Sequence, residues 1–282
     1  MSTIDHVPSQ PRALFAIDWF WVPRAVILGL LAFIIFGPLT NLLLWTVAER
    51  WYFPHVLPLE YGLSYWGRVF SPRGTAMESL SNSIMVATLT VIVAMALAVP
   101  AGYALARLKL PFRALILLTF LIPQAFPNLP VYVNIARIFY QFGLNGTVAG
   151  VVLVHVTHGL VYAVWIATAA FSAVDTELEE AARSIGAGPI RAFRDVSLPL
   201  AAPGLLASAI FVFLESLDEF TGSYFVGAPD VNTLPLLLYT ASSGGNYQIA
   251  SITALLLLIP SVGFMFIVER FLKSDVLSKV GH

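Results

Sequence analysis

Six long apolar segments constrain this chain more than any other feature of its sequence. The hydrocarbon core of a bilayer offers no water to the backbone, so a run of about 20 apolar residues crosses it as a helix. Of the 282 residues, 58% are hydrophobic and 11% are charged, whereas soluble domains have about 25% charged residues. We therefore predict an all-α polytopic membrane protein with six transmembrane helices. The predicted spans are Ala25–Thr46, Ser83–Leu105, Ala114–Val131, Gly146–Phe171, Ala201–Phe225 and Ile249–Leu272.

The connections between these spans differ in composition. The third span is short and interrupted by three prolines, and residues 132–145 after it are predicted to form a short helix on the outer surface. Two other outer segments, 47–82 and 226–248, either receive an external protein or only cover the helical bundle. Residues 13–23 either lie at the membrane interface or begin the first span. No cleavable signal peptide is expected, because the first apolar run is itself long enough to span.

Lys and Arg residues flank the predicted spans unevenly. If both termini are cytoplasmic, eleven of the fifteen Lys and Arg residues lie in cytoplasmic segments, and only Arg50, Arg68, Arg73 and Arg137 lie outside. Cytoplasmic loops normally carry this excess of positive charge. The bias predicts cytoplasmic N and C termini and a cytoplasmic loop between the fourth and fifth spans.

This loop holds the densest charge cluster in the second half of the chain. Asp175 or Thr176 can cap a first short helix, whose opening acids suit the positive end of the helix dipole. Gly186 is predicted to end that helix. Pro189 is well placed at the first position of a second helix, which is predicted to end near Leu198.

Three blocks of this loop keep a fixed spacing: Glu180-Ala181-Ala182, then Gly186, then Val196-Ser197-Leu198-Pro199. They resemble the cytoplasmic EAA loop of ABC importer permeases, which has Ile at the Val196 position. In that family the loop forms a coupling helix that docks in a groove of the ATP-binding subunit. Small side chains suit close packing against a partner. The alternative is a polar hairpin that merely joins two spans.

The resemblance implies a type I ABC importer permease fold. Residues 1–24 would be a cytoplasmic or interfacial segment, and residues 25–282 a six-helix permease domain with the coupling loop 175–199. The implied partners are two ATP-binding subunits, a second permease subunit and an external solute-binding protein, in a bacterial inner membrane. No G-x-x-x-x-G-K-[ST] motif occurs, so we expect no enzymatic activity and no cofactor in this chain, with ATP and Mg on the partner ATPase subunits. The candidate residues for coupling to the ATPase are Glu179, Glu180, Ala181, Ala182, Gly186, Arg191, Leu198 and Pro199.

Three acids, Glu215, Asp218 and Glu219, fall within the fifth apolar run, where an uncompensated charge costs roughly 2.5–3.5 kcal/mol. Their spacing places them near one helical face. The Arg and Lys residues all lie at span ends or in loops, where none can pair with these acids. The acids therefore face a water-filled cavity, the bundle interior or a partner subunit. With His158, they form our candidate translocation pathway. The alternative is that they are interior polar groups bonded to backbone or to nearby hydroxyls.

Different segments favour different substrates. Residues 81–113 and 129–147 resemble the second permease of sugar-type importers, whereas residues 216–242 resemble spermidine/putrescine-type permeases. Because the three acids have no basic partner, we predict a polyamine-like cation, with a sugar or polyol as the alternative. From another class of protein, a proton-coupled secondary transporter that uses the membrane acids is the competing hypothesis.

His155 and His158, three residues apart in the fourth span, would need a third ligand to hold a metal, and none is near in sequence. We therefore predict hydrogen bonds in the bundle interior and no metal site. The chain has no cysteine, no nucleophile–base spacing and no basic patch that would bind nucleic acid. Its predicted surroundings are the lipid bilayer and its protein partners.

Overall fold

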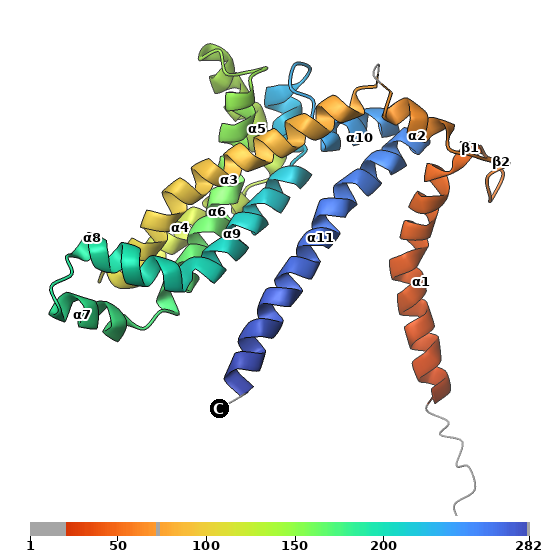
Figure 1. Cartoon of the computed structure of the whole chain (residues 1–282). Coiled ribbons are helices and arrows are strands. Elements are labelled where there is room, and N and C mark those ends of the chain that lie inside the picture. Colours follow the sequence, from red (N-terminus) through yellow and green to blue (C-terminus); the bar gives the residue numbers. More distant parts are fainter. Residues whose placement is uncertain (1–20, 72–73, 281–282) are drawn as a thin grey trace, which may run out of the picture. The chain divides into compact units, whose positions relative to one another are not determined.

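A computed structural model describes residues 21–71 and 74–280 and divides the chain into two units, residues 1–44 and 45–282 (Figure 1). Helix α1 (Trp21–Thr46) contains the described residues of the first unit and ends with two residues of the second unit, Trp45 and Thr46. This helix begins four residues before the predicted span and continues through Pro38. Its apolar side chains are exposed, as expected of a helix that faces lipid. Most of the predicted interfacial stretch, residues 13–20, lies outside the described residues.

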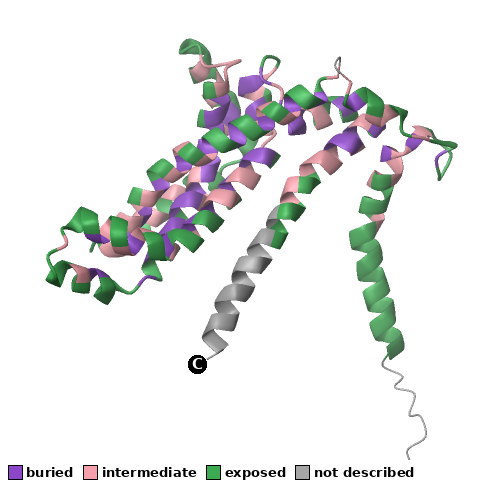
Figure 2. Ribbon diagram, in the orientation of Figure 1, coloured by how far each residue is buried: buried purple, intermediate pink, exposed green. Residues whose placement is uncertain are grey.

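Three long helices pack together as the core of the second unit, where Figure 2 shows most of the buried residues. They are α3 (Ala76–Arg107), α6 (Val148–Ser172) and α9 (Leu198–Asp218). Small residues bring them close: a Cβ placed on Gly102 of α3 would lie 2.8 Å from the Cβ of Ala167 of α6. Gly204 of α9 faces Ala170 of α6 in the same way, at 2.6 Å. Small residues are the usual means by which helices approach in a membrane.

The polytopic, all-helical prediction is confirmed. By length and composition, α1, α3, α6 and the helical run that ends with α9 can each cross a membrane. A bent pair, α4 (Arg113–Ala125) and α5 (Asn128–Gln141), forms a further candidate, with 92° between its two helices. The described apolar part of α11 (Tyr247–Val280), up to Gly263, is a shorter apolar helix.

The third predicted span differs from the observed elements. The chain breaks at Phe126 and Pro127, because proline disfavours a helical conformation in the residue before it, and α5 then leads away from α4. The predicted surface helix 132–145 corresponds to α5, which starts earlier, at Asn128. Tyr132 of α5 is fully buried and fixes this helix to the core.

The fifth span was predicted to reach Phe225, which is wrong. Helix α9 ends at Asp218, and a separate π-helical turn, η2 (Ser223–Gly227), follows. The carboxylate of Glu219 accepts the backbone N–H of Gly222 at 2.7 Å and so caps the start of this turn. Capping by an acid ends one helix and begins the next within a single apolar run.

Shorter elements connect the long helices. The strands β1 (Ala48–Arg50) and β2 (Glu60–Tyr61) form an antiparallel hairpin, followed by α2 (Ser64–Val69). Near the C terminus, α10 (Leu234–Ser243) packs against α11. Figure 1 shows α10 and α5 at one end of the α3–α6–α9 bundle, and α7 and α8 at the other.

The contact between Gly102 and Ala167 predicts a position that tolerates no larger side chain. In Gly102→Val the added atoms meet Ala167 and the Thr168 backbone at 2.8–2.9 Å. Overpacking of this kind costs roughly 1–3 kcal/mol, so the thermal unfolding midpoint of the detergent-solubilised protein should fall by roughly 2–10 °C. Gly29→Val, where a Cβ meets no atom within 4 Å, is the matched control. Equal midpoints for the two variants would contradict the close approach.

Candidate functional site

The charged loop between α6 and α9 folds into a helical hairpin. It consists of α7 (Thr176–Ser184) and α8 (Pro189–Ala192), at the end of the bundle where α3 and α6 finish (Figure 1). The Asp175 carboxylate accepts the Glu177 N–H at 2.9 Å and caps α7, one of the two caps that the sequence predicted. Pro189 is the first residue of α8, also as predicted.

Gly186 ends α7 in a left-handed conformation, with φ of 95°. The Ala187 N–H donates to the Ala182 carbonyl at 3.1 Å, and the Gly186 N–H donates to the Arg183 carbonyl at 3.0 Å. This pair of bonds is the Schellman arrangement, which favours glycine because other residues rarely adopt positive φ. Gly186 therefore sets the direction in which the chain leaves α7.

The second helix of the loop does not end near Leu198, and that prediction was wrong. One helical run continues from Pro189 to Asp218. The join is a π-helical turn, η1 (Phe193–Ser197), in which the Leu198 N–H reaches the carbonyl five residues back. Pro199 has no N–H, and its ring would crowd the carbonyl four residues back, so the wider turn lets the helix pass the proline unbroken.

The hairpin exposes large apolar side chains. Ile185 is 89% exposed, Ile190 81% and Leu178 48%. Leu178 and Ile185 lie outside the candidate spans, and Ile190 is the second residue of the run Pro189–Asp218. An exposed apolar group of this kind is typical of an interaction surface. Of the candidate coupling residues, Glu180, Ala181, Gly186, Arg191 and Pro199 are exposed, Ala182 and Leu198 are half-buried, and Glu179 is buried.

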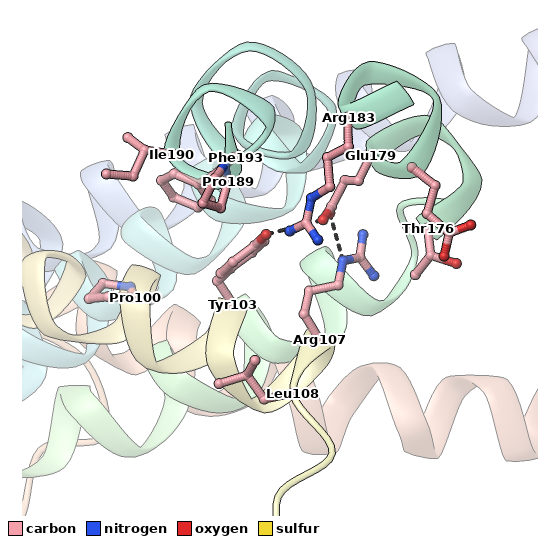
Figure 3. A pocket seen from close by; sticks show the side chains of 11 residues that line it. Pro100, Tyr103, Arg107, Leu108, Thr176, Glu179, Arg183, Pro189, Ile190 and Phe193 are labelled. Atoms are coloured by element: carbon pink, nitrogen blue, oxygen red, sulfur yellow. Dashed lines mark hydrogen bonds and ion pairs between the residues drawn. The ribbon is translucent and has the colours of Figure 1, made fainter. Parts of the chain in front are cut away.

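Glu179 points into the protein instead of toward the surface (Figure 3). Its carboxylate accepts three hydrogen bonds: from Arg107 Nε at 2.7 Å, Tyr103 Oη at 3.1 Å and Ser197 Oγ at 2.6 Å. Arg107 also donates from Nη2 to the Val174 carbonyl at 2.8 Å. We call Tyr103, Arg107, Glu179 and Ser197 the Glu179 cluster. It connects the last turn of α3 with α7 and with η1.

Sequence analysis missed three members of this cluster. Arg107 counted only as a charge that sets orientation, Ser197 only as part of the Val196–Pro199 block, and Tyr103 had no role. Arg107 and Glu179 stand 72 positions apart in the chain, and no local period relates residues at that distance. Two local features could have indicated the pair. Arg107 lies at the end of a predicted span, and Glu179 is a loop acid that is not needed to cap α7, because Asp175 caps it.

A cavity of about 550 Å³ opens beside the Glu179 cluster (Figure 3). Pro100 of α3 and Leu108, which directly follows α3, line it on one side, and Ile190 and Phe193 line it from the opposite side. Arg183 of α7 also contributes to the lining. Beside this cavity, the hairpin and the end of α3 are joined by the Glu179 cluster and by the Phe193 ring, whose centroid lies 4.7 Å from that of Tyr103.

The Glu179 carboxyl is ionised at neutral pH. Burial by itself raises the pKa of this carboxyl. Hydrogen bonds from Ser197, Arg107 and Tyr103, together with the Arg107 charge, outweigh that effect and hold the pKa below its ordinary value of 4.5. The Arg107 and Glu179 side chains are only 9% and 7% exposed, so water screens their attraction little.

The three candidate pathway acids lie at the opposite end of α9 from the hairpin. Glu215 and Asp218 are in its last turn, half-buried and exposed respectively. Glu219 has left the helix, and its carboxylate caps the next turn. The three therefore do not share one continuous helical face. None of them forms an ion pair within residues 21–71 and 74–280.

His158, the fourth candidate pathway residue, is buried beside these acids. Its Nδ1 lies 3.4 Å from Gln124 Nε2, and its ring lies 5.4 Å from that of Tyr132. A Cβ on Gly222 would meet both Tyr132 and Glu219, at 3.4 and 3.5 Å. His158, Tyr132 and Glu219 are thus brought together, although they come from three different segments. The Tyr132 hydroxyl is buried within this group.

His155 is a hydrogen-bonded residue of the bundle interior. Its Nδ1 lies 2.7 Å from Ser216 Oγ, and its Nε2 lies 2.9 Å from Ser223 Oγ. Both ring nitrogens are therefore engaged by hydroxyls. Across the described part of the chain, no group of three or more His, Cys, Asp or Glu side chains is placed to hold a metal ion.

Comparisons with known proteins place these features in context. Residues 98–275 match the family described as "Binding-protein-dependent transport system inner membrane component". The chain is similar to the trehalose transport system permease protein SugB of Mycobacterium tuberculosis (strain CDC 1551 / Oshkosh). The two are 33% identical over 204 residues, which cover 70% of this chain and 74% of SugB.

Two further similarities extend over more of the chain. The alpha-glucoside transport system permease protein AglG of Rhizobium meliloti (strain 1021) is 28% identical over 239 residues, covering 82% of this chain and 63% of AglG. A crystal structure of a bacterial ABC transporter involved in the import of the acidic polysaccharide alginate aligns with a TM-score of 0.68. That alignment covers 93% of this chain and 99% of the other, at 17% identity, and shows a shared fold.

The lowered pKa of Glu179 predicts a pH dependence. Ionised Glu179 stabilises the fold above pH 4.5, its ordinary value, and this contribution is lost as the pH falls through the lower folded pKa. Acidification from about pH 6 to about pH 3.5 should therefore lower the thermal unfolding midpoint more in the natural protein than in Glu179→Gln. Glu177→Gln, an exposed acid of the same helix, should keep the natural slope. A Glu179→Gln slope equal to the natural one would contradict the assigned ionisation.

Proposed function

The chain belongs to the family of binding-protein-dependent transport system inner membrane components, and we propose that it passes a sugar or polyol through an ATP-driven importer. It is a multi-pass inner-membrane permease and not an enzyme, and ATP is bound by a partner ATPase subunit. The observation that carries the proposal is the α7–α8 hairpin, a capped and glycine-terminated element that exposes Ile185 and Ile190. A protein partner would cover these side chains.

The hairpin is the proposed docking element for the ATPase. In this arrangement the hairpin and both chain termini face the cytoplasm, with residues 1–24 as a cytoplasmic segment and 25–282 as the permease domain. Ala181 and Gly186 let the partner approach closely, because they project almost nothing from the surface. Exposed Glu180 and Arg191 add polar contacts around the apolar centre, an arrangement typical of protein interfaces.

The proposed assembly contains two ATP-binding subunits, a second permease subunit and an external solute-binding protein. Closure of the ATP-binding subunits would displace the hairpin, and the attached helices would then alternate access to a central cavity. The long apolar faces left exposed on the described helices, for example at Ile92 and Leu97 of α3, suit contact with lipid or with the second permease.

The substrate proposal departs from the polyamine-like cation predicted from charge. The relatives SugB and AglG are named for trehalose and alpha-glucoside transport, which supports the alternative of a sugar or polyol. An ionised carboxylate is a hydrogen-bond acceptor for a neutral sugar hydroxyl and not only for an ammonium group. Unpaired Glu215 and Asp218 therefore suit a neutral substrate rich in hydroxyls.

Local helix stability does not explain where these acids lie. Glu215 and Asp218 occupy the last turn of α9, where the negative end of the helix dipole disfavours an acid. Neither has a basic partner among the described residues. Glu215 and Asp218 therefore lie where an acid costs stability and has no basic partner to compensate, which supports a role for them in the pathway.

The docking proposal predicts the effect of a charge at Gly186. In Gly186→Asp the protein should insert in the membrane but lose ATP-driven uptake in reconstituted vesicles, because the new carboxylate would be desolvated in the interface. Gly186→Asn, which has a similar shape and also tolerates positive φ, is the control and should retain much more uptake. Normal uptake by Gly186→Asp would exclude the docking role.

The substrate proposal predicts which solute the complex moves. Proteoliposomes that contain the full transporter should import a radiolabelled disaccharide and not spermidine. Asp218→Asn and Glu215→Gln should each reduce this uptake by roughly tenfold, because a hydrogen bond to a charged group contributes about 1.5–3 kcal/mol. Asp230→Asn, at an exposed acid beyond α9, serves as the control. Import of spermidine with no import of sugar would restore the cation hypothesis.

A further inference from the structure

The Glu179 cluster lies between the docking hairpin and the spanning helices. Backbone packing against α7 comes from α8 and η1, and the cavity of about 550 Å³ lies between the hairpin and the end of α3. The connection from α7 to α3 is therefore made by side chains. Glu179 supplies the acceptor from α7, and Arg107 and Tyr103 supply donors from α3.

Stability alone is a poor reason for such a cluster. A buried ion pair loses hydration that its attraction barely replaces, so apolar residues of the same size often serve stability as well or better. What the cluster does provide is a fixed orientation of α7 relative to α3. The Glu179 carboxylate has three donors, and Arg107 has a second acceptor in the Val174 carbonyl, so rotation of α7 against α3 would break several bonds at once.

Helix α8 is already continuous with α9. The geometry points to the Glu179 cluster as the joint that makes the α7–α8 hairpin move as one body with α3 as well when a partner displaces it. This inference rests on the proposed function. Glu179 and Arg107 are positioning residues in this scheme, because they contact neither ATP nor substrate. Without the joint, the hairpin tilts into the neighbouring cavity and α3 stays in place. The complex then moves less substrate for each ATP that it hydrolyses.

The test compares ATP hydrolysis with transport in the complete reconstituted transporter. In Glu179→Gln and in Arg107→Gln, the ATP consumed per substrate imported should rise roughly three- to thirtyfold. Glu177→Gln is the matched control, since it removes an exposed acid from the same helix and should keep the natural ratio. The double variant Glu179→Gln/Arg107→Gln should be no worse than either single change, because both remove the same connection.

Covalent rescue separates a joint from a requirement for folding. The natural chain has no cysteine, so Arg107→Cys with Glu179→Cys introduces a unique pair of thiols. A reversible bis-methanethiosulfonate linker, applied to the assembled complex, should restore the natural ratio, and reduction should abolish it again. A role confined to folding would not respond, because the protein has folded before the linker is added.

Three results bear against the inference. A natural ratio in both single variants would overturn it. Parallel loss of hydrolysis and transport, not reversed by the linker, would also overturn it and leave the cluster a structural role only. If the natural complex itself shows no ATP-driven import, the proposed function fails, and the inference fails with it.

Discussion

The lack of water in the hydrocarbon core determines where this protein can place charge and irregular backbone. Within α3, α6 and α9 the backbone groups bond inside each helix, and Ala and Gly residues let the helices approach closely. Polar function is therefore confined largely to the two ends of the bundle. One end carries the charged α7–α8 hairpin, and the other carries Glu215, Asp218 and the cap formed by Glu219.

Features that depend on near neighbours were predictable from the sequence. The Asp175 cap, the glycine stop at Gly186 and the proline start at Pro189 each need only a few adjacent residues, and all three occur. The start of α3 was placed seven residues too late, at Ser83 instead of Ala76. The span was located by its apolar residues, and the first two turns of α3 are partly polar. The direction in which Glu179 points depends on a residue 72 positions away, which no local pattern reveals.

The errors in α9 share a physical cause. Proline in a sequence signals a break, yet the helix passes Pro199 because a π-helical turn removes the steric conflict. An apolar run predicts a continuous helix, yet α9 ends at Asp218. The Glu219 carboxylate instead accepts the Gly222 N–H and so begins the next turn. Composition measures what a bilayer tolerates, whereas the ends of helices are set by individual hydrogen bonds. Charge likewise does not decide the substrate by itself, since a carboxylate accepts a hydrogen bond from a neutral hydroxyl as well as from a cation.

The Glu179 cluster lies at the C-terminal end of α3, where a charged group no longer has to lie in hydrocarbon. An apolar contact at this place would hold two surfaces together but let them slide, because dispersion forces have little directional preference. Hydrogen bonds to an ionised carboxylate favour particular angles and distances, so they resist rotation as well as separation. A hairpin that adjoins a cavity and is attached by directional bonds can transmit a displacement that the same hairpin, attached by apolar contact alone, would absorb.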